Sequence, residues 1–167
     1  MQEHPFYILL VEDNQDHAEL VKRTLEKTET ESLIFHVDNG ESALDFLYRR
    51  GIYQDNLCFP KPNLILLDLR LPKIDGLEVL RAIKQEERFL DIPVVILTSS
   101  DTEQDLTKAY RYHANSYLTK PVDFIKFSNM MKDFGDYWLY CNKTVDWNKT
   151  IDLKKDTNWH KSMDRLF

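Results

Sequence analysis

Short hydrophobic runs recur along the chain at regular intervals. The five runs cover residues 6–11, 33–37, 64–67, 92–97 and 116–118. Three of them are continuously apolar instead of alternating between apolar and polar residues, which is typical of strands buried on both faces of a parallel sheet. The pattern therefore predicts five strands.

Between these runs, apolar residues repeat at the three- and four-residue spacing of a helix with one buried face. The repeats fall within residues 17–25, 43–50, 76–83, 106–113 and 124–138. Asp13-Asn14, Asn39 and Ser100-Asp101 are suitable caps for three of the helices, and Pro121 suits a first helical turn. Strands that alternate with helices predict an α/β fold, a doubly wound five-stranded parallel sheet flanked by five helices.

The length of 167 residues suits one compact domain. We expect this domain to span residues 5–141, with a long connector at residues 51–62 that contains two prolines. Residues 142–167 form a polar C-terminal tail, which is too short to be a separate domain.

Composition excludes some classes of function. The net charge is −6, and an acidic chain of this kind lacks the clustered positive charge of a nucleic-acid surface. No window approaches the roughly 18 to 20 apolar residues that a membrane span needs, and the N-terminus does not resemble a signal peptide. Cys58 and Cys141 match no metal or redox spacing. We therefore expect a cytoplasmic protein with no nucleic-acid or membrane partner.

The chemistry is expected at the carboxyl ends of the predicted strands, which meet at one crevice in such a sheet. The residues at these ends are Glu12-Asp13 after the first strand, Asp68 after the third, Thr98-Ser99 after the fourth and Lys120-Pro121 after the fifth. Each alone has an ordinary explanation as a cap, a strand end or a turn. Their joint occurrence, each at the end of its own strand, favours a functional site.

Electrostatics indicates what this set of residues would bind. Two carboxylates about 4 Å apart repel by roughly 4 kcal/mol at an effective dielectric constant near 20, and one lysine cannot neutralise three of them. Oxygen-only ligands favour Mg²⁺ over zinc. Asp68, held against Mg²⁺ beside Lys120 and Thr98, is a plausible nucleophile for phosphoryl transfer, and the backbone amides of Arg70 and Ser99 would add stabilisation.

Four segments resemble the response-regulator receiver family. They are LLVEDN at 9–14, ILLDLRLPKIDG at 65–76, PVVILTS at 93–99 and YLTKP at 117–121. The resemblance implies a flavodoxin-like fold with strand order 2-1-3-4-5. It also implies that Asp68 is the phosphoacceptor of a switch that catalyses its own phosphorylation and dephosphorylation, rather than of an enzyme.

The same resemblance assigns the remaining roles. Asp13, Asp68 and the backbone carbonyl of Arg70 would bind Mg²⁺ directly, and Glu12 would bind it through water. Lys120 would pair with Asp68 or a phosphoryl oxygen, Thr98 would move to bond the phosphoryl group, and Tyr117 would swing inward. The Lys120–Pro121 peptide bond would be cis.

A narrower resemblance points to the response regulators of bacterial and cyanobacterial phytochromes. It rests on the connector at 51–62, the FLDIPVVILT stretch at 89–98 and the DYWL motif at 136–139. It implies a single-domain regulator that is phosphorylated by a phytochrome-like sensor histidine kinase, forms a homodimer and signals through the face of the fourth helix, fifth strand and fifth helix.

Arg70 departs from the family pattern, which commonly has Asn or Met two residues after the acceptor. Its guanidinium would be able to shield or bind the acyl phosphate. Two alternatives stay open. A Mg²⁺-dependent aspartyl-nucleophile phosphatase of the haloacid-dehalogenase type needs a second Asp at the position of Arg70, and an inactive pseudo-receiver usually lacks the acceptor, a metal carboxylate or the lysine.

Overall fold

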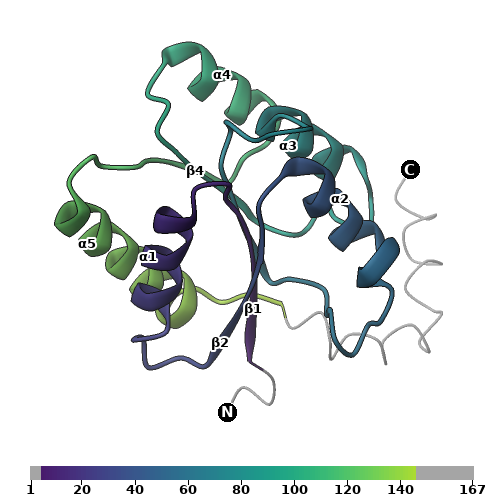
Figure 1. The fold of residues 1–167 in the computed structure, drawn as a ribbon, viewed down its shortest axis with the longest axis horizontal. Coiled ribbons are helices and arrows are strands. Elements are labelled where there is room, and N and C mark those ends of the chain that lie inside the picture. The colour runs from purple at the N-terminus through teal and green to yellow at the C-terminus, as the bar shows by residue number, and fades with distance from the viewer. Residues whose placement is uncertain (1–4, 146–167) are drawn as a thin grey trace, which may run out of the picture.

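The computed structural model describes residues 5–145. Its five parallel strands form one sheet in the order β2-β1-β3-β4-β5 (Figure 1). They are β1 (Phe6–Val11), β2 (Ser32–Val37), β3 (Leu64–Leu67), β4 (Val94–Thr98) and β5 (Ser116–Thr119). The predicted doubly wound, flavodoxin-like sheet is therefore confirmed.

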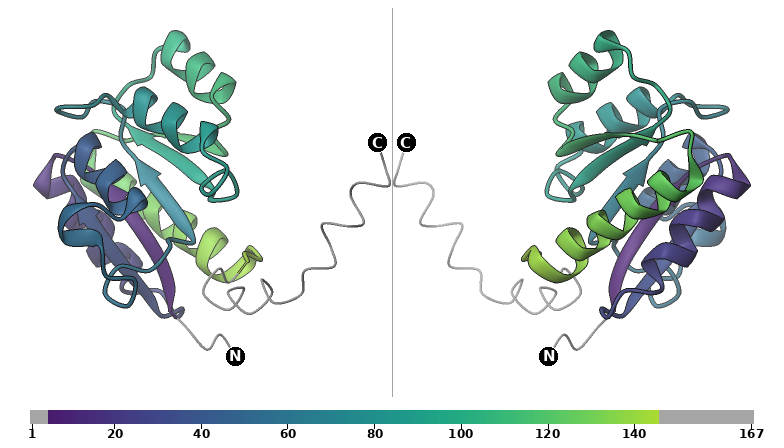
Figure 2. Two further views of the ribbon diagram at one scale, coloured as in Figure 1. Left: turned by 90° about the vertical axis from the view of Figure 1, so that its right-hand side faces the viewer. Right: turned by 90° about the vertical axis from the view of Figure 1, so that its left-hand side faces the viewer.

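Helices cover both faces of the sheet. They are α1 (Gln15–Leu25), α2 (Gly40–Tyr48), α3 (Gly76–Gln85), α4 (Glu103–Arg111) and α5 (Phe124–Gly135). α1 and α5 lie together on one face, and α2, α3 and α4 lie on the other (Figures 1 and 2).

The central strands supply both hydrophobic cores, because successive side chains of a strand point to opposite faces. In β1, Leu9 and Val11 belong to the core under α2–α4, whereas Ile8 and Leu10 belong to the core under α1 and α5. All four side chains are at most 1% exposed. This two-sided burial explains why the strand is continuously apolar in sequence.

The side chains that cap the helices are Asn14, Asn39, Asp75, Thr102 and Asp123. Asn14 and Asn39 agree with the sequence. The prediction for Ser100-Asp101 is wrong, because Thr102 caps α4 while the Ser100 hydroxyl donates to Asp105 instead. Pro121 likewise precedes α5, which begins at Phe124.

Two short helical segments add to the five α-helices within the described residues. The last helix is α-helical only to Gly135 and continues as a π-helical segment, Asp136–Cys141. The connector includes a 3-10 turn, Gly51–Tyr53, and is anchored to α2 by aromatic contacts of Tyr53 and Phe59 with Phe46.

Within residues 5–145, no helix is both long and apolar enough to cross a membrane. Most of the predicted polar tail, residues 146–167, lies outside the described residues.

Candidate functional site

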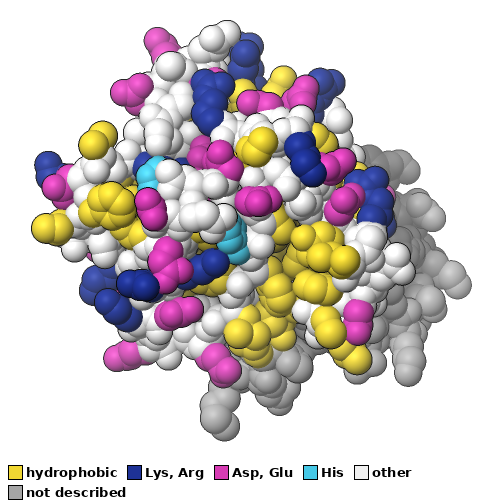
Figure 3. Space-filling model, viewed as in Figure 1, with side chains coloured by type: hydrophobic (Ala, Val, Ile, Leu, Met, Phe, Trp, Pro, Cys, Tyr) yellow, Lys and Arg dark blue, Asp and Glu magenta, His cyan; other side chains and the backbone are white. Residues whose placement is uncertain are grey.

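Three carboxylates converge at the carboxyl ends of β1 and β3. Glu12, Asp13 and Asp68 each present a ligand oxygen, and these oxygens lie within 4.8 Å of one another. Glu12 is 1% exposed and Asp68 6% exposed, whereas Asp13 faces solvent. In the space-filling view, carboxylates are scattered over this face of the protein, and some of them lie near its middle (Figure 3).

Lys120 joins the carboxylates from the end of β5. Its Nζ forms an ion pair with Glu12 and donates to Asp68 Oδ2 at 2.7 Å. Its backbone N–H donates to the carbonyl oxygen of Thr98 at 2.7 Å, which ties the end of β5 to the end of β4. The Lys120 side chain is almost fully buried, and its ammonium group lies between the Glu12 and Asp68 carboxylates.

The site has more negative than positive charge. Burial raises the pKa of Glu12 above its ordinary value, although Lys120 opposes this effect. The surplus itself follows from the side chains present, because three carboxylates lie together with one lysine. The ligand atoms of this cluster are carboxylate oxygens, which fit a hard cation such as Mg²⁺.

The loop after Asp68 holds this side chain in place. The backbone N–H of Arg70 donates to Asp68 Oδ1 at 3.3 Å. Gly76, the first residue of α3, donates its N–H to the Leu69 carbonyl at 2.9 Å, and a Cβ at this position would overlap the backbone carbonyl of Asp68. Only glycine allows α3 to approach the backbone of Asp68 so closely.

Thr98 and Tyr117 occupy positions that suit the predicted switch. Thr98 is fully buried, and its Oγ1 accepts a hydrogen bond from the Ser100 N–H at 3.3 Å. The Tyr117 hydroxyl donates to the Ser100 carbonyl at 2.9 Å, and burial raises the pKa of this phenol. Both side chains therefore contact the β4–α4 loop, which also contains Ser99.

One predicted feature is wrong. Among residues 5–145 no peptide bond is cis, so the Lys120–Pro121 bond is trans. The trans form of a bond to proline is intrinsically favoured by about 0.5–1 kcal/mol. Lys120 reaches Asp68 and Glu12 with the bond in this form.

His17 was missed as a site residue, because its spacing matched the apolar face of α1. Its Nδ1 lies 3.3 Å from Lys120 Nζ and 3.7 Å from Glu12 Oε1, and its ring packs edge-on against Phe127. Burial, followed by the nearby Lys120, lowers the pKa of His17. Its place in the first turn of α1, shortly after the Glu12-Asp13 pair, was the available signal.

Asp105 was also missed. It lies in the first turn of α4, where an acidic residue is common, yet it is only 6% exposed. Its carboxylate accepts hydrogen bonds from the Arg70 guanidinium and the Ser100 hydroxyl, and the second of these is the main reason that the pKa of Asp105 is lowered. The sequence carries no signal for this burial.

A separate hollow of about 410 Å³ lies far from the acidic cluster, at the C-terminal ends of α3 and α4. Its lining is Arg81, Lys84, Gln85, Arg111, Tyr112 and His113. Cations at helix C-termini balance the exposed carbonyl dipoles, and Lys84 Nζ donates to the Ile92 carbonyl at 2.8 Å. The positive charge around this hollow is therefore explained by its position at the C-terminal ends of α3 and α4.

Comparison with known proteins agrees with the geometry. Residues 8–132 match the response regulator receiver domain. The chain belongs to the response regulator receiver family. It is 44% identical over 142 residues to "Probable methanogenesis regulatory protein FilR2" of Methanothrix harundinacea, covering 85% of this chain and 89% of that protein. It is 41% identical over 135 residues to response regulator Rcp1 of Synechocystis sp., covering 81% of this chain and 90% of Rcp1.

Solved structures of receivers extend the comparison. The Mn²⁺-bound form of Rcp1 matches with a TM-score of 0.81 and 39% identity, over 84% of this chain and 99% of that one. The phosphorylated cyanobacterial phytochrome response regulator RcpA matches with a TM-score of 0.81 and 34% identity, over 86% and 100%. The match to RcpA confirms the predicted resemblance to phytochrome-associated response regulators.

Proposed function

We propose that this receiver accepts a phosphoryl group on Asp68 from the phosphohistidine of a sensor histidine kinase, in a reaction that requires Mg²⁺. The observation that carries the proposal is the contact of buried Lys120 with both Asp68 and Glu12, in a cluster where three carboxylates share one lysine. The unit that carries this function is residues 5–141.

The oxygen ligands suit a magnesium site. Asp13, Asp68 and the Arg70 carbonyl would hold the ion directly, and Glu12 would hold it through water. Rcp1, which this chain resembles, has been solved with Mn²⁺ bound. When bound, Mg²⁺ would offset the excess negative charge and attract the phosphoryl oxygens.

The transfer step requires little movement of the protein. Asp68 Oδ attacks phosphorus while the P–N bond to the donor imidazole breaks, and the bonding electron pair stays on the imidazole nitrogen. Lys120 moves from the Asp68 carboxylate to a phosphoryl oxygen, and the backbone N–H groups of Arg70 and Ser99 donate to the others. The ion pair between Lys120 and Glu12 is kept during this exchange. Hydrolysis later returns Asp68 to its carboxylate form.

The signal would arise from the β4–α4 loop. The phosphoryl group adds about −1.5 to −2 charges and would attract the Thr98 hydroxyl, which now accepts from Ser100 N–H. Movement of this loop would alter the hydrogen bond between Tyr117 and Ser100. Tyr117 would then turn inward, and the face made by α4, β5 and α5 would change.

The partner we propose is a phytochrome-like histidine kinase in the cytoplasm, and the regulator would act as a homodimer. RcpA, named as a phytochrome response regulator, matches over 86% of this chain. Val122, Phe124 and Ile125 are 57–100% exposed and closely follow Lys120, so they offer an apolar surface beside the site.

Intact-mass measurement after incubation with acetyl phosphate tests the core of the proposal. The protein should gain one phosphoryl group with Mg²⁺ and none with EDTA, and Asp68→Asn should gain none under either condition. Asp75→Asn, which alters a nearby helix cap, is the matched control and should still be labelled. Labelling of Asp68→Asn, or none of the wild type, would contradict the proposal.

The phosphatase alternative receives no support. Arg70 stands where the general acid would be, and its guanidinium pairs with Asp105. Sustained turnover of small phosphomonoesters would contradict this conclusion. A pseudo-receiver is equally unsupported, because the acceptor, the metal carboxylates and the lysine are all assembled.

A further inference from the structure

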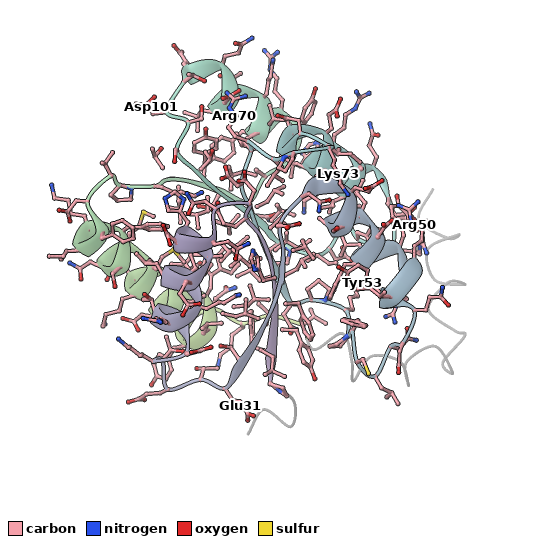
Figure 4. All side chains as sticks on the ribbon, in the orientation of Figure 1. Glu31, Arg50, Tyr53, Arg70, Lys73 and Asp101 are labelled. Carbon is pink, nitrogen blue, oxygen red and sulfur yellow. The ribbon has the colours of Figure 1, made fainter. Side chains whose placement is uncertain are left out.

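Asp105 is a buried acidic residue outside the phosphorylation site. It is 6% exposed although it lies in the first turn of a surface helix. Its Oδ2 accepts a hydrogen bond from the Ser100 hydroxyl at 2.5 Å and forms an ion pair with the Arg70 guanidinium. Figure 4 shows Arg70 beside α4, on the side of the loop that carries Asp101, whereas Lys73 of the same β3–α3 loop lies near α2 and α3.

The two partners of Asp105 come from the two loops that carry the phosphorylation chemistry. Arg70 is two residues after Asp68, and its N–H donates to the acceptor carboxylate. Ser100 is two residues after Thr98, and its N–H donates to the threonine hydroxyl. A single carboxylate on α4 thus joins both loops.

The position of Arg70 bears on the stability of an acyl phosphate. The Arg70 backbone contacts Asp68 Oδ1, so a guanidinium released from Asp105 would be able to reach a phosphoryl group on Asp68. Guanidinium groups bind phosphate oxygens through paired, charge-assisted hydrogen bonds. In the structure this side chain is instead bound to Asp105.

Burial explains why Asp105 can retain the guanidinium. Asp105 is shielded from water, so removing the cation leaves its negative charge with the Ser100 hydroxyl as a remaining hydrogen-bond donor, which is unfavourable. Arg70 itself is 61% exposed, so the penalty falls mainly on Asp105. This penalty opposes transfer of Arg70 to the phosphoryl group.

We propose that Asp105 is a positioning residue that holds the Arg70 guanidinium away from phosphorylated Asp68 and so keeps the acyl phosphate open to hydrolysis. In that hydrolysis, water oxygen bonds to phosphorus, the P–O bond to Asp68 breaks with its electron pair left on the carboxylate, and the water proton passes to phosphate or solvent. A released guanidinium would cover the phosphoryl oxygens and the approach of water. This inference rests on the proposed function of Asp68.

The test is the rate of dephosphorylation. Each protein is phosphorylated with acetyl phosphate and Mg²⁺, freed of the donor, and followed by intact mass in saturating Mg²⁺. Asp105→Asn should lengthen the lifetime at least about threefold. Arg70→Ala removes only the guanidinium and keeps the backbone carbonyl and N–H that the proposed site uses, so its lifetime should stay within about twofold of wild type. The double variant should return to that same range, because without the guanidinium nothing is left to shield the phosphoryl group.

Controls separate this effect from changes in folding. Lys73→Ala removes a cation from the same loop that pairs with Glu41 on α2, and its lifetime should equal that of wild type. Circular dichroism checks the fold, and Asp105→Ser replaces Asp105→Asn if the latter does not fold. The dependence on Arg70 is the readout that a purely structural role of Asp105 would not produce.

The inference is overturned if Asp105→Asn leaves the lifetime unchanged, shortens it, or lengthens it equally when Arg70 is also removed. Failure of the wild type to become labelled is a different result, since it would overturn the proposed role of Asp68.

Discussion

Two polar clusters lie at the carboxyl ends of the strands, and they differ in the balance of negative and positive charge. In the acidic cluster, Glu12, Asp13 and Asp68 share the single cation of Lys120. In the second cluster, Asp105 has one guanidinium and one hydroxyl for its one negative charge. The first is deficient in positive charge, and the second is balanced.

This difference indicates how each cluster contributes to the protein. A surplus of buried negative charge is unfavourable for folding and is retained where a cation or a reaction requires it. The balanced pair of Asp105 and Arg70, with the Ser100 hydroxyl, stabilises the arrangement of the β3–α3 and β4–α4 loops against α4. The contrast predicts opposite responses to the removal of one negative charge, and four experiments examine it.

The largest effect is expected from Lys120→Met. This change leaves Glu12 and Asp68 buried without their cation, and breaking such a pair costs about 3–5 kcal/mol. Urea unfolding in EDTA measures the decrease in the free energy of unfolding, and added Mg²⁺ should reverse part of this decrease. A loss below about 1 kcal/mol would mean that Lys120 does not balance the acidic cluster.

Mg²⁺ should stabilise the protein through the acidic cluster alone. Binding to the folded state alone raises the free energy of unfolding by about 2.7 kcal/mol when the Mg²⁺ concentration is 100 times the dissociation constant. Urea unfolding with Mg²⁺ and with EDTA gives the difference. Asp105→Asn should keep the full effect and Asp13→Asn should lose most of it, so equal responses from the two variants would erase the distinction between the clusters.

Asp105→Asn should reduce the free energy of unfolding by about 1–3 kcal/mol at neutral pH, since it removes a charged acceptor with two donors. The pKa of Asp105 is lowered in the folded protein, so its contribution is complete above the ordinary value of about 4 and is lost as the pH falls below it. The difference between wild type and variant should therefore shrink below pH 4. Urea unfolding across pH 2–7 measures this, and a difference that grows toward low pH would exclude an ionised Asp105.

The smallest effect has the opposite sign. Without metal, Asp13→Asn should raise the free energy of unfolding by up to about 1 kcal/mol, because this exposed carboxylate repels its neighbours through a dielectric close to that of water. Thermal unfolding in EDTA measures the change. Destabilisation in EDTA would show that Asp13 contributes to the fold and not only to cation binding.

Much of the fold was predictable because the strands are bounded by clear changes in polarity. β1 and β3 begin and end as predicted, since each apolar run is followed directly by an acidic residue. β4 begins at Val94 and not at Ile92, where the predicted run began. Pro93 between them lacks a backbone N–H for the sheet.

The site was predictable where it depends on topology and less so where it depends on side-chain orientation. Glu12, Asp68 and Lys120 lie at strand ends, so the strand order alone brings them together. The pairing of Arg70 with Asp105 depends instead on the path of two loops. Three-residue spacing in α1 likewise did not reveal that His17 faces Lys120.

The close approach of Gly76 to the Asp68 carbonyl has a mechanical consequence. Because α3 rests directly on the backbone of Asp68, a tilt of this helix would displace Asp68 relative to Glu12 and Asp13. A protein that docks on the outer surface of α3 would thus be able to change the reactivity of Asp68 without touching the acidic cluster.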